Sequence, residues 1–344
     1  MQNRLVTPGP LHDRKGHLIE SGFATSLIKT YDRERIKAPG YRIKEWDYYL
    51  IGTDRYALAV TISDNGYLGL DSVSLMDFDK KTALTHTALS AFPMGKRNLP
   101  PTSMEGTSRA RGKNYELNFV VGQGKRALYG HVYDYAKTGK HLLFDLELAD
   151  VKQDSMVIVT PFHNKPRHFY YNQKINCLPA NGSVILGEET LAFAPATAFG
   201  VLDWGRGVWP YTDTWYWGSA SGIVDRKAFG FNIGHGFGDT SRASENMVFY
   251  GGTAHKLGQV DFKEPRSGGK ADYLAPWQVS DTQGRLKLTF EPLLDRAANI
   301  NALVLASDQH QVFGRFHGTA VLDDGRMLNI RNLTGFLEKV ANRW

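Results

Sequence analysis

The chain has 344 residues, of which 42% are hydrophobic and 22% are charged. These proportions are those of an ordinary folded protein and exclude an intrinsically disordered chain, and the length allows two domains or one large one. The net charge of +6 comes from 41 basic and 35 acidic residues that are interspersed along the chain, which argues against nucleic acid as a partner.

The single cysteine and the lack of long apolar runs restrict the compartment. Cys177 alone cannot form an intrachain disulfide or a cysteine-based zinc site, which favours a reducing environment. The first residues lack the apolar core of a secretory signal, and no window approaches the ~18 consecutive apolar residues of a spanning helix. We therefore expect a cytoplasmic protein without a membrane span.

The first half of the chain predicts an N-terminal cover followed by antiparallel strands. Residues 1–40 are polar and turn-rich, and Thr25–Ile36 is compatible either with a short helix or with irregular chain. Apolar and polar residues then alternate in short runs, broken at Asn65-Gly66, a pair that favours tight hairpins. The run Ser90–Gly112 is rich in Pro and Gly and predicts a loop over one end of a barrel. We expect a first β domain over residues 41–162.

The second half repeats the same strand pattern, so we expect a second β domain over residues 163–344. Asn181-Gly182 predicts another hairpin turn ahead of an aromatic run. The closing residues predict a helix that has four apolar side chains on one face: Leu333, Phe336, Leu337 and Val340. The chain is therefore expected to be all-β, as two barrels in tandem or one continuous β body, with short helices at the N- and C-termini.

The run Ala198–Gly222 contains four of the seven tryptophans, namely Trp204, Trp209, Trp215 and Trp217, together with Tyr211. Rings at this density form a wall that is apolar in its body and polar at the indole and phenol tips, which suits a cavity for a mostly apolar ligand. An ordinary β core is the alternative, because W-x-W places two tryptophans on one face of a strand. Carbohydrate also remains open as a ligand, since tryptophan faces suit sugars.

Asp203 is the candidate catalytic acid within this run. Burial among aromatic rings raises the pKa of a carboxyl group, which can then donate a proton near neutral pH, and the rings attract a developing cation. Arg206 supports a different interpretation, in which it keeps Asp203 ionised in a structural salt bridge. The sequence leaves both interpretations open.

Two further polar residues, His235 and Glu245, follow within two strands and converge on Asp203 if consecutive strands pair. The chain contains no H-x-H or H-E-x-x-H motif, so we expect no metal site. The glycine-rich runs at 122–125 and 234–238 lack a strand-to-helix context and are interpreted as turns, so we expect no cofactor.

The sequence resembles a bacterial and fungal family of proteins of unknown function, number 2804. The resemblance rests on G-V-L-D-W-G-R-G and W-Y-W-G-S-A-S-G, with Y-N-Q-K-I before them and V-F-G-R-F-H-G-T-A-V-L-D-D-G after them. The likeness covers nearly the whole chain. More remotely, the central motif resembles the carotenoid 1,2-hydratase and lipocalin-like cyclase group. That resemblance implies tandem lipocalin-like (calycin-type) antiparallel barrels or sheets, with the ligand between or inside them.

In the hydratase group an acidic residue of this motif protonates a double bond, and the resemblance implies that Asp203 takes this place. Trp204 matches the tryptophan of the group's W-G pair, and Trp215 with Trp217 matches its W-x-W. This chain departs from the pattern because Asp203 directly precedes Trp204 and because Leu202 stands where the group has an aromatic residue. These departures weaken the inference of a reaction more than that of a fold.

The first functional expectation is a binding or carrier protein for an apolar small molecule, lipid-like or isoprenoid-like. Its expected ligand-binding residues are Trp204, Arg206, Trp209, Tyr211, Trp215, Trp217, His235 and Glu245. The alternative is a cofactor-independent hydratase, cyclase or isomerase with Asp203 as its acid. The partner expected in both cases is the apolar small molecule, and self-association stays open.

Overall fold

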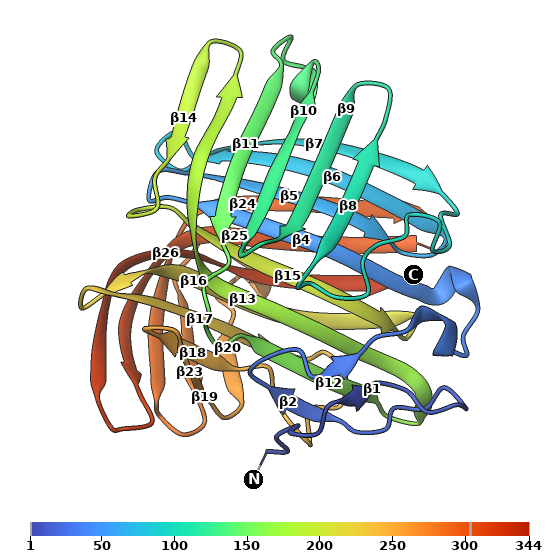
Figure 1. Ribbon diagram of the computed structural model, residues 1–344. Coiled ribbons are helices and arrows are strands. Elements are labelled where there is room, and N and C mark those ends of the chain that lie inside the picture. The colour runs from blue at the N-terminus through green and yellow to red at the C-terminus, as the bar shows by residue number, and fades with distance from the viewer. Residues whose placement is uncertain (1, 303–304, 344) are drawn as a thin grey trace.

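The computed structural model describes residues 2–302 and 305–343, and within these ranges almost all regular structure is antiparallel β-strand. The strands form two large curled sheets, one of 13 strands and one of nine, seen in Figure 1 as a blue-to-green group and a yellow-to-red group. Two 2-stranded sheets accompany them. The fold is therefore all-β and tandem lipocalin-like, as expected from the sequence.

The bounds of the strands are as follows. The main path of the first sheet contains β4 (Ile43–Gly52), β5 (Tyr56–Asp64), β6 (Leu68–Asp77), β7 (Thr82–Ala91), β8 (Gly106–Arg111), β9 (Tyr115–Gly122), β10 (Lys125–Val132), β11 (Leu142–Ala149), β13 (Lys165–Leu186) and β15 (Phe199–Val208). Beside this path lie β2 (Gly22–Ala24), β12 (Met156–Phe162) and β14 (Glu189–Phe193). The second sheet contains β16 (Thr212–Val224), β17 (Lys227–His235), β18 (Met247–Tyr250), β19 (Thr253–Lys256), β20 (Val260–Lys263), β23 (Trp277–Asp281), β24 (Leu286–Ala302), β25 (Leu305–Val321) and β26 (Met327–Arg343). The short elements are β1 (Gly9–Pro10), β3 (Lys29–Thr30), β21 (Arg266–Ser267), β22 (Lys270–Ala271) and the 3-10 turns η1 (Arg33–Arg35), η2 (Gly40–Arg42) and η3 (Tyr135–Lys137).

The strand order shows where the chain passes from one sheet to the other. In the first sheet β4 pairs with β15, and β15 pairs with β13, so that segments far apart in sequence lie side by side. The second sheet begins with β16, which pairs with β17 and β26. The expected domain boundary at residue 163 falls between β12 and β13, inside the first sheet, whereas the sheets separate between Val208 and Thr212. The division into domains by residue number stays a prediction.

Both expected helices are absent from the described ranges, which contain no α-helix. Thr25–Ile36 forms β3 and the turn η1, and the run from Leu333 onward belongs to strand β26. The reason is that β26 is buried on both faces: Leu333 and Leu337 lie in the core of the second sheet, whereas Phe336 contacts the side chains between the sheets. When both faces of a strand are buried, its apolar residues no longer alternate with polar ones, and their spacing can match the 3.6-residue repeat of a helix.

The two Asn-Gly pairs have different outcomes. Asn65-Gly66 lies between β5 and β6, and Gly66 has a φ of +80°, which suits a tight turn. Asn181-Gly182 lies inside β13 and makes no hairpin, so that prediction was wrong. Gly182 is required there because a Cβ would lie 2.1 Å from the carbonyl oxygen of Asp145 on β11. Close strand packing therefore explains this glycine.

Buried side chains form three regions. The first core lies inside the curl of the first sheet, and the second core lies inside the curl of the second sheet. The third region, here called the intersheet layer, holds the buried side chains between the sheets, among them two apolar clusters that share Trp46 and Trp215. The Pro-rich loop folds into the first sheet, where Leu99 and Ser103 are buried. The first core is thus filled by side chains and by this loop.

Candidate functional site

A row of ionisable side chains crosses the first sheet on the face that borders the intersheet layer. Tyr48 on β4 is the register partner of Asp203 on β15, and Asp203 is the register partner of Lys174 on β13. Register partners in antiparallel strands project from the same face with Cβ atoms roughly 5 Å apart. The fold thus places a phenol, a carboxyl and an ammonium group next to one another, although they lie on strands far apart in sequence.

Asp203 is buried and accepts hydrogen bonds from neutral donors. The side-chain amide of Asn172 donates to Asp203 Oδ1 over 2.6 Å, and the Trp46 indole also hydrogen-bonds to the carboxyl group. Burial raises the pKa of Asp203, although nearby Lys174 and the Asn172 hydrogen bond act in the opposite direction. The carboxyl group is therefore held in a state from which it can donate a proton closer to neutral pH than an exposed aspartate.

Lys174 is the centre of a hydrogen-bonded cluster. Its Nζ donates to Glu245 Oε2 (2.8 Å), Tyr170 Oη (2.9 Å) and Asn172 Oδ1 (3.0 Å). The ring centroid of Trp217 lies 4.9 Å from the same Nζ, within cation–π range. Burial disfavours the ammonium ion, but Glu245, Tyr170 and Asp203 together outweigh burial and hold the pKa of Lys174 above its usual range. Lys174 therefore stays charged.

The second sheet presents a facing row. Trp217, Glu338, Gln311 and Arg296 are successive register partners on β16, β26, β25 and β24. Gln311 Nε2 donates to Glu338 Oε2 over 3.1 Å, and the Trp215 indole donates to Glu338 Oε1 over 3.2 Å. Burial raises the pKa of Glu338, and the charge of Asp203 adds to this effect. Two buried carboxyl groups, one from each sheet, therefore influence each other's protonation.

Tyr48 connects the two rows. Its hydroxyl donates to Gln311 Oε1 across the intersheet layer, over 3.4 Å, and its ring packs edge-on against Trp217 with centroids 6.0 Å apart. Burial raises the pKa of Tyr48 to about 12. The phenol is therefore neutral at physiological pH and acts as a hydrogen-bond donor.

A cavity of about 350 Å³ lies between the sheets beside these rows. Its walls include Leu50 and Val201 from the first sheet and Ser219 and Phe313 from the second. Leu50 and Val201 stand two residues from Tyr48 and Asp203 on the same strands, so these two wall residues separate the cavity from the ionisable row. A second hollow of about 10 Å³, the space of one water molecule, lies on the other side beside Tyr170 and Glu245.

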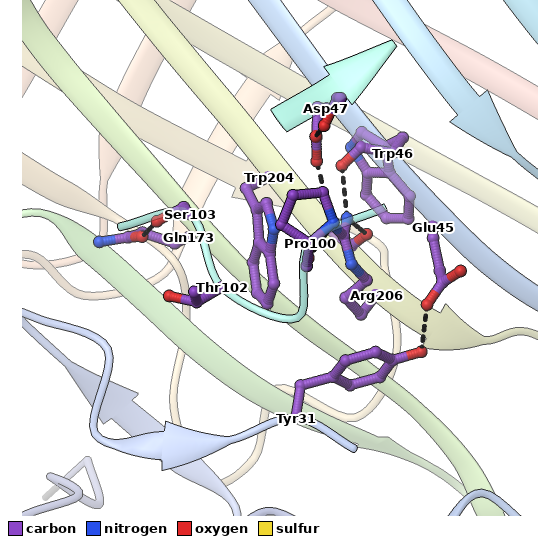
Figure 2. Close-up of polar contacts among 12 residues, drawn as sticks. Tyr31, Glu45, Trp46, Asp47, Pro100, Thr102, Ser103, Gln173, Trp204 and Arg206 are labelled. Atoms are coloured by element: carbon purple, nitrogen blue, oxygen red, sulfur yellow. Dashed lines mark hydrogen bonds and ion pairs between the residues drawn. The ribbon is translucent and has the colours of Figure 1, made fainter. Parts of the chain in front are cut away.

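Arg206 does not pair with Asp203. The two residues are three positions apart on β15 and project from opposite faces. Figure 2 shows that Arg206 points into the first core, where it donates to Asp47 Oδ1 (3.1 Å), the Trp46 carbonyl (2.8 Å) and the Pro100 carbonyl (2.7 Å). The Trp204 ring lies 4.4 Å from the guanidinium carbon. The arginine therefore ties the Pro-rich loop to the first sheet and leaves Asp203 free of a guanidinium partner.

The structure gathers only some of the expected ligand-binding residues. Trp215, Trp217 and Glu245 join Asp203 in the intersheet layer, and Trp209 packs near them against Phe237 at 5.0 Å between ring centroids. Three others lie elsewhere: Trp204 and Arg206 in the first core, and Tyr211 at 45% exposure in the turn after β15. His235 is exposed beside Tyr216 and borders the second hollow, which Glu245 also lines. The tryptophan run therefore lines two separate regions.

Sequence reasoning missed Tyr48, Lys174 and Glu338. One local signal pointed to Lys174, because Asn172, Lys174 and Asn176 alternate with the larger side chains of their strand and so share a face. Positions 169–178 of β13 are all buried, and a polar face within such a stretch indicates a buried polar site. Nothing local pointed to Tyr48 or Glu338, since their approach to Asp203 depends on pairing between distant strands.

Among the described residues, no group of three or more His, Cys, Asp or Glu side chains is arranged to hold a metal ion. In the same ranges no helix has the length and apolar character needed to cross a membrane.

The chain belongs to the family described as domain of unknown function DUF2804, whose match covers residues 2–344. No curated protein matches it. Kievitone hydratase from Nectria haematococca has a similar structure, with a TM-score of 0.53, 11% identity, and coverage of 92% of this chain and 96% of that one. A candidate AttH from Nitrosomonas europaea gives a TM-score of 0.50, 14% identity, and coverage of 92% and 98%. At such identities the likeness shows a shared fold, and it agrees with the resemblance to the hydratase group.

Proposed function

We propose that the protein is an acid–base enzyme that adds water to a carbon–carbon double bond of a small molecule bound between the two sheets. Asp203 is the general acid. The observation that carries the proposal is the position of Asp203: it is buried, has no arginine partner, lies between Tyr48 and Lys174, and stands two residues along β15 from the cavity wall at Val201. The shared fold with a protein described as a hydratase supports the same class of reaction.

The reaction can be written so that protons balance. Asp203 delivers its proton to one alkene carbon, the π electrons form the new C–H bond, and a cation develops on the neighbouring carbon. Water attacks this carbon, and its surplus proton returns to the Asp203 carboxylate. The rings of Phe199 and Phe313 in the cavity wall stabilise the cation, since ring quadrupoles attract positive charge. All proton transfers use side chains of this chain, so the proposal requires no cofactor.

Lys174 and Glu245 act on Asp203 through electrostatics. A charged Lys174 beside Asp203 stabilises the carboxylate that remains after proton transfer, and Glu245 holds the lysine in place. Asn172 contacts both groups, because its amide nitrogen donates to Asp203 and its oxygen accepts from Lys174. These three are positioning residues.

The test is turnover by the purified full chain in a metabolite extract of its host, followed by mass spectrometry in ordinary and heavy-oxygen water. The expected result is a compound that disappears and a product heavier by one water molecule that carries the heavy oxygen. Asp203→Asn should slow this conversion by roughly 10²–10⁴-fold, the usual contribution of a general acid. Asp145→Asn, on the exposed face of β11, is the matched control and should convert at the wild-type rate.

Three outcomes separate the alternatives. A compound that is retained by wild type and by Asp203→Asn alike, and never converted, would indicate the carrier role expected first from the sequence. Conversion at equal rates by both forms would show that Asp203 is not the acid. A product of unchanged mass would indicate isomerisation or cyclisation in place of hydration.

A further inference from the structure

We infer that the cavity between the sheets binds a compact molecule with an apolar body and one anionic group, and that Arg331 recognises the anion. This inference deepens the proposed function and rests on it, because it names the substrate class of the same site. The ligand inferred here is a compact member of the apolar small molecules expected from the sequence.

The size of the cavity limits the ligand. Its volume of about 350 Å³ is at the lower end of the roughly 300–1,000 Å³ found for small-molecule sites. Small residues on both sheets, among them Ala57, Ser219 and Gly335, line the space, and their short side chains leave it unfilled. A single ring system or a similarly compact body fills such a volume.

The inner end of the cavity is closed. Tyr48, Trp217 and Phe336 lie in the intersheet layer beyond the cavity walls, and each is at most 8% exposed. The rings of Trp217 and Phe336 pack edge-to-face with centroids 4.7 Å apart. At this inner end a molecule stops against Leu50 and Val201, which lie two residues from Tyr48 and Asp203 on the same strands. The reactive part of the ligand is therefore its inner end.

The cavity is lined by two charged residues, Asp54 and Arg331, and only one of them is neutralised. Asp54 Oδ1 accepts hydrogen bonds from Thr334 Oγ1 (2.6 Å) and Arg315 Nη1 (3.2 Å). Arg331 forms no ion pair with any carboxylate in the described part of the chain. The charge left unbalanced at the cavity is therefore positive.

The backbone presents Arg331 at the cavity edge. The register between β25 and β26 shifts next to this residue, between Phe316 and Gly318, and Asn332 adopts a φ of +54°. Such a bulge redirects side chains away from the regular alternation of a strand. A guanidinium group here can bind a carboxylate, sulfonate or phenolate through paired hydrogen bonds. The anion would then lie at the opposite end of the ligand from Asp203, where it does not oppose ionisation of the acid.

The experiment compares three fluorescent probes on the full chain: anilinonaphthalene sulfonate, its neutral counterpart phenylnaphthylamine, and parinaric acid with its long acyl chain. The sulfonate should bind more tightly than the neutral probe by about ten-fold or more, the effect of charge-assisted hydrogen bonds. Arg331→Gln should abolish this difference. Arg109→Gln, an exposed arginine of β8, should preserve it. Parinaric acid should bind more weakly than the sulfonate.

Four results would each overturn the inference. The two naphthyl probes could bind equally, or neither could bind. Arg331→Gln could keep the wild-type preference for the sulfonate, or parinaric acid could bind more tightly than the sulfonate. A thermal melt of Arg331→Gln verifies that the variant folds. Probe binding is measured without turnover. A failure of the binding inference can therefore be told apart from a failure of the proposed function. If Asp203→Asn leaves turnover unchanged while the probe preferences hold, the proposed function falls and the binding inference stands.

Discussion

The buried pair of Lys174 and Glu245 gives the sharpest test of the intersheet layer, through the change Lys174→Met. The N–O distance of the pair is 2.8 Å, and the two side chains are 3% and 14% exposed. Removing one partner of such a pair leaves the other charge buried and unpaired, which typically costs about 3–5 kcal/mol. Glu245 keeps a hydrogen bond from Asn232 Nδ2 at 3.1 Å and some solvent contact, which favours the lower end. We expect a loss of about 3 kcal/mol in the free energy of unfolding.

Two further variants separate burial from charge pairing. The double change Lys174→Met with Glu245→Gln removes both charges, so the loss should fall to about 1 kcal/mol. Lys125→Met breaks an ion pair of the same 2.8 Å length with Glu147, but those side chains are about half exposed. A pair of that kind contributes at most about 1 kcal/mol, so this control should change little.

The measurement is urea-induced unfolding at neutral pH, with the free energies compared only between variants that share one m-value. If Lys174→Met lowers the free energy of unfolding no more than Lys125→Met does, the stabilising contribution of the buried pair is refuted. A double variant that loses as much as Lys174→Met alone would refute it too, because the coupling through Glu245 would then be absent. Either result would also remove the support that Lys174 gives to Asp203 as the acid.

Three other predictions concern stability. The raised pKa of Asp203 means that the native state keeps this proton while the unfolded chain loses it, so Asp203 costs stability increasingly as the pH rises above about 4. The free energy of unfolding of Asp203→Asn, relative to that of wild type, should therefore rise between about pH 4 and pH 8 in denaturant unfolding. A difference between the two proteins that does not change with pH would contradict this. Burial lowers the pKa of His12 to about 4, so stability should be lost as the pH falls from about 6.5 towards 4. His12→Phe should remove this loss in thermal melts, and persistence of the loss would exclude His12 as its source. Gly205→Ala would place a Cβ 1.9 Å from Trp46 Cζ2 and should destabilise by about 1–3 kcal/mol; an unchanged urea midpoint would show that Trp46 can move aside.

The fold class could be predicted because its signals are local. Alternating apolar residues and turn pairs such as Asn65-Gly66 report on a few consecutive residues, and most strands followed them. The failures arose where tertiary contacts override the local signal. Asn181-Gly182 has the sequence of a hairpin but serves close packing within β13, and β26 has a helical spacing because both of its faces are buried.

The site could be predicted only in part, for the same reason. Asp203 stands out in sequence as a carboxyl group within an apolar aromatic run. Strand alternation alone separates it from Arg206, since residues three apart on a strand project to opposite sides. The partners Tyr48 and Lys174 became visible only with the register of β4, β15 and β13. Register between distant strands is set by the whole core, so no short motif encodes it.

The position of β26 has a consequence for biosynthesis. This strand comes last in the described chain, yet it lies in the interior of the second sheet, between β16 and β25 (Figure 1). Until it has left the ribosome, β16 and β25 each present an unpaired edge, and such edges recruit other chains. The second sheet therefore cannot be completed before β26 has been synthesised. Chains that lack β26 should depend on chaperones, whereas in the folded protein β26 pairs with both β16 and β25.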